Sequence, residues 1–303
     1  MGRISVRQLG FAVGAEVTGV DLRQPLDDFA RKDILDAWHR HLVLVFPGQE
    51  LSADEQIGFS RNFGELERND FQPHYRDAEH PEILLVTNKH LNGKPSETRN
   101  TGRNWHSDLT YTTRPAKASL LLCKEKPPVG GDTMWANQYL AFETLSPPMR
   151  AFVETLEAIH DVSLIKGIEK RDPQKVADMK RLNPPVAHPV VKTHPETGRK
   201  ALFLGQRIRG FVGYTEEESA PILAFLNEHA TSPEFVYRHG WSVNDLVMWD
   251  NRCLLHLALP DFDQTKTRHM IRTSILGEPS GYYVQDTVAP EKESLMQAIA
   301  SVS

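Results

Sequence analysis

Short apolar segments bounded by turn residues recur along this chain, and they do not alternate regularly with helices. Strands are expected near 11–22, 42–46, 81–87, 105–111, 116–123, 132–137, 188–194, 200–204, 234–238, 246–249, 252–256 and 270–276. The few helical patterns cover 28–41, 52–64, 146–156 and 215–226. A parallel α/β sheet would require regular alternation of strands and helices. The pattern therefore predicts a mainly β protein with helical insertions, either a jelly roll or another double sheet.

The length and composition are compatible with one large domain. The chain has 303 residues, of which 40% are hydrophobic and 25% charged, so a sizeable core can form. We expect a single domain over 1–303. Three polar stretches, 67–80, 88–104 and 163–184, are expected to be mobile loops, the last as a lid or an insertion.

Charge and cysteine content exclude several classes of protein. A net charge of −5 argues against a protein that wraps duplex DNA, because such proteins carry a strong basic excess. Two cysteines cannot form a disulfide framework, and no signal peptide or bilayer-spanning apolar run is evident. We therefore expect a cytoplasmic protein with neither nucleic-acid nor membrane partners. We also expect a homo-oligomer, a dimer or a tetramer.

A His-x-Asp pair in the segment NWHSDLTY is the first candidate for chemistry. On a strand, residues i and i+2 point to the same face, so His106 and Asp108 could reach one metal ion. His256, on an apolar strand late in the chain, is a candidate third ligand, although a buried structural histidine is the simpler interpretation. Two histidines and one carboxylate leave three open coordination positions, as in non-haem Fe(II) oxygenases.

Two arginines follow His256 in the segment TRHMIRTSILGE. Alternation along a strand would turn Arg268 and Arg272 toward one face, which is costly in a core unless anions meet them. Arginine binds carboxylates bidentately, so a dicarboxylate cosubstrate and an anionic substrate would account for both. The alternative is that both arginines lie on a solvated face.

These motifs together resemble the taurine dioxygenase / chlorophenoxyacetate dioxygenase family of Fe(II)- and 2-oxoglutarate-dependent enzymes. The resemblance covers nearly the whole chain and is carried by GAEVTGVDL, WHSDLTY, GGDTMWAN, HPVVKTHPETGRKALF, WDNRCLLH and RHMIRTSILGE in this order. It implies a double-stranded β-helix, which is a cupin-like jelly roll.

The resemblance also implies residue roles. It makes His106, Asp108 and His256 the iron ligands, and it pairs Thr133 with Arg268 around the distal carboxylate of 2-oxoglutarate. By the same resemblance Arg272 receives the anionic group of the substrate. Asn104 is implied as a further polar contact to cosubstrate or substrate.

The reaction implied is a hydroxylation. 2-Oxoglutarate and O₂ are consumed at Fe(II), with release of succinate and CO₂, and the resulting oxidant attacks an unactivated aliphatic C–H bond. The metal performs the difficult chemistry, while the protein positions the carbon and excludes water.

The substrate pocket departs from that of taurine dioxygenase. Asn69 and Gln72 replace the two residues that hold taurine, with His74 and Tyr75 as alternative substitutes if the loop carries an insertion. Two aromatic walls of the taurine pocket become Val162 and Ile208, beside which Arg207 and Arg209 add charge. We therefore predict a small organic anion with a larger or more apolar body, such as an aryloxyalkanoate, an alkyl sulfate, another sulfonate or an N-acylated amino acid.

Several alternatives remain open on the sequence. The protein could be a taurine dioxygenase proper, a zinc hydrolase that uses the same three ligands, or a non-catalytic cupin-like protein that binds a small anion. His188, His194 and Cys253 resemble metal ligands, but we expect them to be structural.

Overall fold

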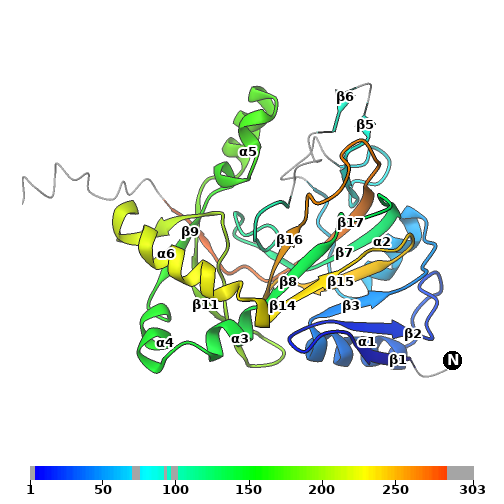
Figure 1. Cartoon of the computed structure of the whole chain (residues 1–303), viewed down its shortest axis with the longest axis horizontal. Coiled ribbons are helices and arrows are strands. Elements are labelled where there is room, and N and C mark those ends of the chain that lie inside the picture. Colours follow the sequence, from blue (N-terminus) through cyan, green and yellow to red (C-terminus); the bar gives the residue numbers. More distant parts are fainter. Residues whose placement is uncertain (1–3, 70–75, 92–93, 97–101, 285–303) are drawn as a thin grey trace, which may run out of the picture.

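The central element is a mainly antiparallel sheet of seven strands. The computed structural model describes residues 4–69, 76–91, 94–96 and 102–284 (Figure 1). The strand order in the large sheet is β1-β2-β3-β15-β7-β17-β4, and only the β2–β3 pair is parallel. The strands span Ser5–Gln8 (β1), Ala15–Thr18 (β2), Val43–Phe46 (β3), Leu246–Asp250 (β15), Ala116–Glu125 (β7), His269–Leu276 (β17) and Leu84–Thr87 (β4).

Smaller sheets form the other half of the molecule. Their orders are β14-β8-β16, β13-β9-β10-β18 and β11-β12, and β5 pairs with β6 in a separate hairpin. Their bounds are Val236–His239 (β14), Thr133–Asn137 (β8), Leu254–Ala258 (β16), Ile208–Phe211 (β13), Glu157–His160 (β9), Val186–Pro189 (β10), Tyr282–Tyr283 (β18), Val191–Thr193 (β11), Lys200–Leu202 (β12), His90–Leu91 (β5) and Lys94–Pro95 (β6).

The core lies on both faces of the large sheet, as β15 illustrates. Leu246 and Met248 belong to the hydrophobic cluster that the sheet forms with α1 and α2. Val247 and Trp249 belong to a second cluster, which also contains Trp135 of β8. Because successive side chains of a strand point to opposite faces, a strand buried on both faces is apolar throughout. The double-sheet architecture agrees with the predicted jelly roll.

The helices lie at the periphery of the sheets (Figure 1). Capping boxes mark the starts of two of the expected helices, with Ser52 and Glu55 at the start of α2 and Thr215 and Glu218 at the start of α6. Asp27 caps α1 through the Ala30 amide. The helices span Asp28–His41 (α1), Ala53–Arg61 (α2), Gln138–Glu143 (α3), Pro147–Val153 (α4), Pro173–Leu182 (α5) and Glu216–Ala230 (α6).

Several segments differ from the sequence-based expectation, and β1, β9, β13 and α3 form where no element was expected. No strand forms over 105–111, where His106 makes only an isolated bridge with His256. The polar stretch 163–184 contains α5 and short 3-10 turns, and its Ile168 and Met179 are buried in a hydrophobic cluster with Val162. In Figure 1, α5 and the β5–β6 hairpin project from the same side of the molecule. The mobility of 67–80, 88–104 and 163–184 stays a prediction.

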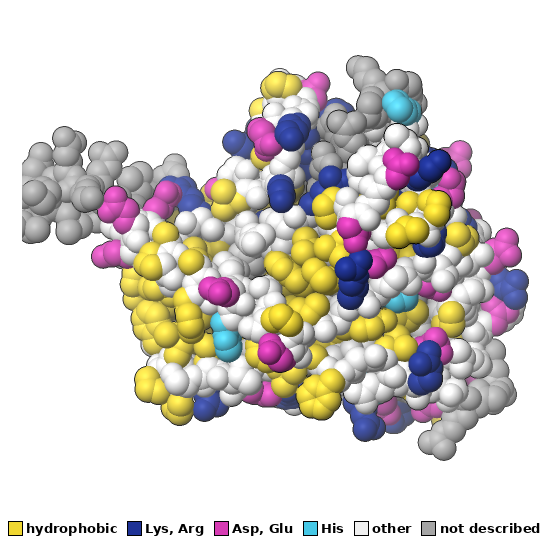
Figure 2. Space-filling model, viewed as in Figure 1, with side chains coloured by type: hydrophobic (Ala, Val, Ile, Leu, Met, Phe, Trp, Pro, Cys, Tyr) yellow, Lys and Arg dark blue, Asp and Glu magenta, His cyan; other side chains and the backbone are white. Residues whose placement is uncertain are grey.

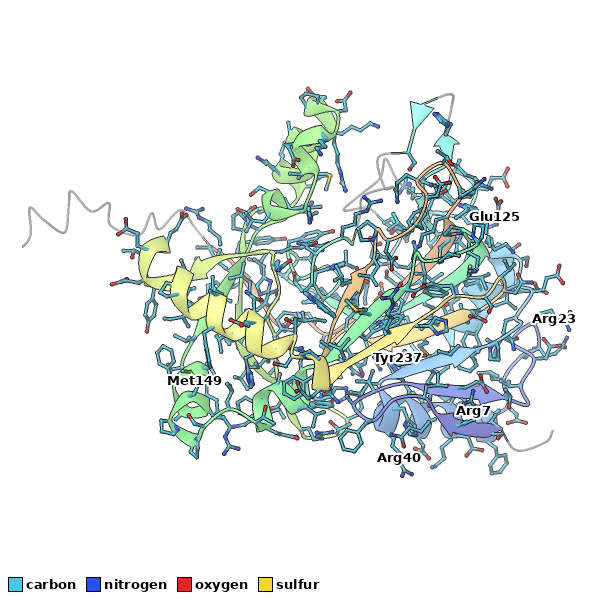
Figure 3. The ribbon with its side chains drawn as sticks, in the orientation of Figure 1. Arg7, Arg23, Arg40, Glu125, Met149 and Tyr237 are labelled. Atoms are coloured by element: carbon cyan, nitrogen blue, oxygen red, sulfur yellow. The ribbon has the colours of Figure 1, made fainter. Side chains whose placement is uncertain are left out.

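The surface is electrostatically mixed. On the face drawn in Figure 2, Lys and Arg side chains lie among Asp and Glu and do not form one continuous basic surface. Arg7, Arg23 and Arg40 are exposed at the periphery, as Figure 3 shows. Among the described residues, no helix combines the length and the apolar character that a membrane crossing needs.

Candidate active site

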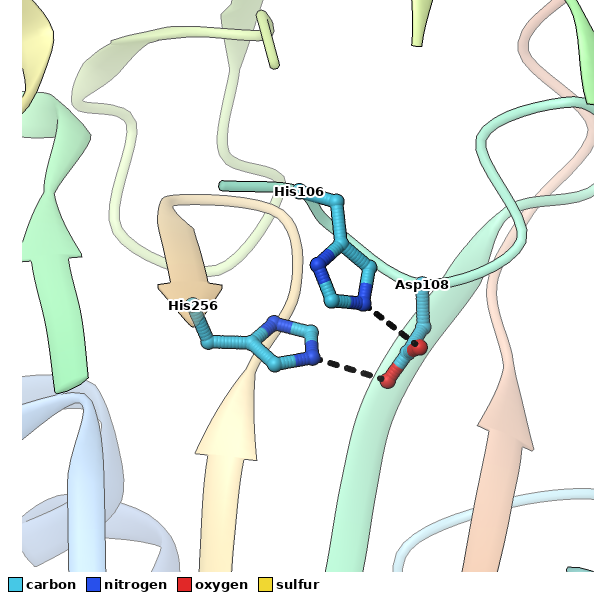
Figure 4. Close-up of side chains that lie close together, drawn as sticks. All are labelled: His106, Asp108 and His256. Carbon is cyan, nitrogen blue, oxygen red and sulfur yellow. Dashed lines mark ion pairs between the residues drawn. The ribbon is translucent and has the colours of Figure 1, made fainter. Parts of the chain in front are cut away.

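Three buried side chains, His106, Asp108 and His256, converge on one another (Figure 4). His106 Nε2 lies 3.8 Å from Asp108 Oδ1, and His256 Nε2 lies 3.7 Å from Asp108 Oδ2. One ligand atom from each of the three residues lies within 4.8 Å of the others. Their exposed fractions are only 2%, 3% and 6% for His106, Asp108 and His256. The structure thus brings together the three residues that the sequence analysis singled out.

A turn, and not a strand, brings Asp108 to the two histidines. The backbones of His106 and His256 exchange hydrogen bonds of 3.1 and 2.8 Å, which fixes one imidazole beside the other. The chain then turns, and Leu109 adopts a left-handed φ of 56°. The expected same-face geometry of a strand is therefore wrong for His106 and Asp108, although the two side chains do meet.

Asn251 holds this turn and was not identified from the sequence. Its Oδ1 accepts hydrogen bonds from the Asp108 amide at 3.2 Å and from the Trp249 indole at 3.0 Å. Its backbone carbonyl accepts a 2.6 Å hydrogen bond from the Ser107 hydroxyl. The residue lies in the motif WDNRCLLH, but only the fold places it against a segment more than 140 positions earlier.

The protonation state of the histidines fits metal binding. His106 Nδ1 lies 2.7 Å from the Asn104 carbonyl, which can only accept, so Nδ1 carries the proton and the Nε2 lone pair faces Asp108. Burial and the nearby Arg207 charge keep the pKa of His106 well below its usual value. Burial also lowers the pKa of His256 to about 4, although Asp108 opposes this. Two neutral imidazoles and one carboxylate are a donor set for a divalent transition metal.

Asp108 is held ionised by its surroundings. Burial alone would raise the pKa of Asp108, but the Arg272 charge and the two histidines lower it below its usual value. Arg272 Nη1 donates to Asp108 Oδ1 at 2.7 Å, and the Ser119 hydroxyl donates to Oδ2 at 2.7 Å. Ser119 is a second contact that the sequence analysis missed, because it lies within the apolar strand β7.

Arg268 is the second buried arginine of the segment, so the solvated-face alternative is wrong for both Arg268 and Arg272. Each is 8% exposed. Arg268 Nε donates to the Gly131 carbonyl at 2.9 Å, which places the guanidinium beside the segment that carries Thr133. Its Nη2 is buried and has no hydrogen-bond partner, and burial lowers the pKa of Arg268 to about 10. Thr133 is buried, and its hydroxyl accepts a 3.0 Å hydrogen bond from Trp241.

The remaining predicted contacts have different environments. Asn104 is buried and its Oδ1 has no partner, whereas Asn69 donates to the Pro81 carbonyl at 2.9 Å. Val162 and Ile208 are buried in two different hydrophobic clusters. Gln72, His74 and Tyr75 lie outside the described residues.

A second group with metal-ligand residue types contains His194, Asp250 and Cys253. Both nitrogens of His194 are already used, since Nε2 meets Asp250 at 3.0 Å and Nδ1 accepts from the Thr197 amide at 3.2 Å. Burial raises the pKa of the Cys253 thiol well above its usual value. His188 Nε2 lies 3.0 Å from the carbonyls of both Thr110 and Thr112. These contacts support the structural roles that we expected for the three residues.

Comparisons with known proteins agree on one family. Residues 5–274 match the family described as "Taurine catabolism dioxygenase TauD, TfdA family". The chain is 35% identical over 271 residues to the alpha-ketoglutarate-dependent 2,4-dichlorophenoxyacetate dioxygenase of Burkholderia sp. (strain RASC), covering 86% of this chain and 91% of the relative. It is 32% identical over 283 residues to an alkylsulfatase of Acinetobacter baylyi (strain ATCC 33305 / BD413 / ADP1), covering 91% of this chain and 86% of the relative.

A solved structure shares the fold. The crystal structure of AAD-2 in complex with Mn(II) and N-oxalylglycine superposes with a TM-score of 0.83 and 32% sequence identity. The superposition covers 91% of this chain and 99% of that chain.

Proposed function

The chain belongs to the TauD and TfdA family of dioxygenases, and from this premise we propose that it hydroxylates an aliphatic C–H bond of a small organic anion. It is an oxidoreductase that depends on alpha-ketoglutarate, which is 2-oxoglutarate. The fold is the cupin-like jelly roll of this family. In the proposed reaction the substrate, 2-oxoglutarate and O₂ give the hydroxylated product, succinate and CO₂.

The convergence of His106, Asp108 and His256 is the observation that carries this proposal. Three buried donors of this kind, with ligand atoms within 4.8 Å, leave one side of a metal ion open. We assign these residues as ligands of Fe(II), which when bound supplies the activation of O₂ that the organic groups of a protein cannot provide. Ser119 and Asn251 orient the carboxylate and its turn.

Arg268 and Thr133 would hold the cosubstrate. The Arg268 guanidinium is fixed through Nε, while its buried Nη2 remains available to a carboxylate oxygen. A buried cation without a counter-ion is costly, so an anionic ligand would relieve it. We assign the distal carboxylate of 2-oxoglutarate to this position, with the Thr133 hydroxyl as a second contact. Asn104, whose Oδ1 is buried without a partner, would contact cosubstrate or substrate on the other side.

Arg272 would orient the anionic group of the substrate. It is buried beside Asp108 and therefore beside the proposed metal position. Val162 and Ile208 provide aliphatic and not aromatic surface, which favours a larger or more apolar body than taurine. Named relatives include a 2,4-dichlorophenoxyacetate dioxygenase, an alkylsulfatase and a putative sulfonate dioxygenase, which supports an aryloxyalkanoate, an alkyl sulfate or a sulfonate as substrate.

The proposal also covers the cellular location and the oligomeric state of the enzyme. Both cysteines are buried free thiols, which is consistent with a reducing cytoplasm. We propose a homo-oligomer, a dimer or a tetramer, without nucleic-acid or membrane partners.

The reaction is tested with a substrate panel under air. Purified protein is incubated with Fe(II), ascorbate, 2-oxoglutarate and one anion from a set of aryloxyalkanoates, alkyl sulfates, sulfonates, N-acylated amino acids and taurine. We expect substrate-dependent succinate in a one-to-one ratio with the hydroxylated or fragmented product. Succinate release coupled only to taurine would contradict the proposed substrate class.

The metal assignment has its own measurement. Anaerobic addition of Fe(II) and 2-oxoglutarate is expected to give a weak visible charge-transfer band, which His106→Ala should abolish together with bound iron. The exposed His90 provides the control substitution His90→Ala, which should leave the band intact. Hydrolysis of a panel member with Zn(II), without a band and without succinate, would favour the zinc hydrolase. Binding of 2-oxoglutarate without O₂ uptake would favour the non-catalytic anion-binding protein.

A further inference from the structure

Arg207 is a buried arginine whose backbone is fixed beside the candidate active site. It lies just before β13, and its carbonyl accepts a 3.0 Å hydrogen bond from the Asp161 amide. The preceding Gln206 amide donates to the Trp105 carbonyl at 2.9 Å, next to His106 in the chain. The Arg207 side chain is only 5% exposed.

The Arg207 guanidinium has no carboxylate partner among the described residues. Its Nε is buried without any hydrogen bond, and its Cζ lies 6.0 Å from the centre of the Tyr111 ring. Burial lowers the pKa of Arg207, while Tyr111 and Asp108 oppose this effect. Asp108 forms its ion pair with Arg272 at 2.7 Å, and no ion pair between Asp108 and Arg207 is found among the described residues.

Arg207 adds positive charge that the site does not neutralise. Arg272 and Arg171 are buried as well, and their positive charges act with burial to lower the pKa of Arg207. An anion placed among these groups would relieve both their repulsion and the cost of burying them.

The neighbouring Arg209 shows that this environment is specific to Arg207. Two residues further along, Arg209 is exposed and pairs with Glu216 at 3.1 Å. The two arginines are separated by one residue in the sequence, and nothing in their local pattern distinguishes them. Only Arg207 lacks a carboxylate partner, and only Arg207 is buried.

We propose that Arg207 is a specificity-determining residue that binds the anionic group of the primary substrate together with Arg272. This inference rests on the proposed function and names a second cationic contact for the same substrate. Guanidinium groups bind sulfonate, sulfate-ester and carboxylate oxygens in charge-assisted hydrogen bonds. The Tyr111 ring and the aliphatic Val162 lie nearby in one hydrophobic cluster and would meet the apolar body of the substrate.

The test compares Arg207→Gln with the matched control Arg209→Gln. The probes are 2,4-dichlorophenoxyacetate, hexyl sulfate and the uncharged 2,4-dichlorophenoxyethanol. Binding to the anaerobic Fe(II)/2-oxoglutarate protein is measured by calorimetry. We expect Arg207→Gln to weaken binding of the anions by roughly 30-fold or more, because one partner of a buried charged contact is removed. Binding of the alcohol should change by less than about 3-fold, and Arg209→Gln should resemble the wild type.

Thermal unfolding provides a measurement that does not depend on turnover. Without ligand, Arg207→Gln should melt at or above the wild-type temperature, since an unpartnered buried cation is removed. An anionic probe should raise the Tm of the wild type and of Arg209→Gln, and at the same concentration it should raise the Tm of Arg207→Gln by much less. Arg207→Lys keeps the charge and should recover part of the shift.

The outcomes separate this inference from the proposed function. Equal anion binding by wild type and Arg207→Gln would overturn the role of Arg207 while leaving the oxygenase intact. Equal weakening for the anions and for the alcohol would also overturn it, because the residue would then only shape the pocket. If wild type binds neither anionic probe but releases succinate with another class of compound, both the substrate class and this role of Arg207 fail.

Discussion

Arg272 donates a hydrogen bond of 2.7 Å to Asp108, the only carboxylate of the proposed metal centre. Both side chains are buried, so the pair is protected from solvent screening. The contact keeps Asp108 ionised, but it also places a fixed positive charge at an oxygen that a metal ion would use. Arg272 therefore affects both of the ligands that this site is proposed to hold, the metal and the substrate anion.

Replacement of Arg272 should affect the binding of Fe(II) and the binding of the substrate differently. In Arg272→Gln the affinity for Fe(II) should stay the same or rise, because a cation that competes for Asp108 is removed. The KM for the anionic substrate should rise by roughly 30-fold or more, because a buried charged contact to the substrate is lost. Iron titration and steady-state kinetics measure the two effects separately. Loss of iron with an unchanged KM would assign Arg272 to the metal centre alone.

Arg268 should affect the cosubstrate and not the metal. In Arg268→Ala the KM for 2-oxoglutarate should rise by about 30-fold or more, since the buried guanidinium with a free Nη2 is lost. Iron content should remain that of the wild type. Arg238→Ala is the control. The exposed Arg238 pairs at 2.8 Å with Asp132, which follows Gly131, the residue that Arg268 contacts, in the loop before β8. An equal rise in both variants would mean that the loop, and not the buried cation, binds the cosubstrate.

Ser119 should tune the metal affinity through Asp108. Its hydroxyl donates to Asp108 at 2.7 Å and accepts from Asn251 at 2.9 Å, so it fixes the carboxylate in one orientation. Ser119→Ala should weaken Fe(II) binding by about 10-fold. This is the lower end of the loss in metal affinity expected when a residue that hydrogen-bonds to a metal ligand is removed. Ser60→Ala removes an equally buried hydroxyl outside the site and should leave iron binding unchanged. The measurement is competition for Fe(II) with a chelator.

Asp250 should make the fold sensitive to acid. It is fully buried, meets His194 at 3.0 Å and accepts hydrogen bonds from Arg252 at 2.6 and 2.8 Å. Burial alone would raise the pKa of Asp250, but Arg252 and His194 lower it below its usual value. A lowered pKa in the folded state contributes stability above the unfolded value of about 4, and this stability is lost as the pH falls below it.

The matching experiment is urea unfolding of Asp250→Asn at two pH values. At pH 7 the variant should be less stable by about 3–5 kcal/mol, the cost of breaking a buried ion pair. At pH 3.5 the difference should be smaller, because the wild type has begun to lose the same contribution. A difference that is equal at both pH values would show that the carboxylate charge does not stabilise the fold.

Local sequence patterns predicted those helices and strands whose formation depends mainly on residues close together in the chain. The capping boxes at Ser52 and Thr215 mark helix starts through side chains three residues apart. The buried strand β15 was evident as an apolar run, because both of its faces meet cores. The strand expected over 105–111 is wrong. The conformation of this segment depends on its contact with His256, far along the chain, and not on the alternation of its own residues.

The sequence by itself determined the residue types of the candidate site and their order: His106, Asp108, His256, Arg268 and Arg272. It could do so because these residues lie in short motifs whose combination is specific to one family. Only the tertiary structure decided how they meet. The turn at Leu109 brings Asp108 to the histidines. The hydrogen bond from the Asp108 amide to Asn251, a residue far along the chain, holds this turn. Burial likewise separates Arg207 from Arg209, because the cost of an unpaired charge depends on what surrounds it and not on its neighbours in the chain.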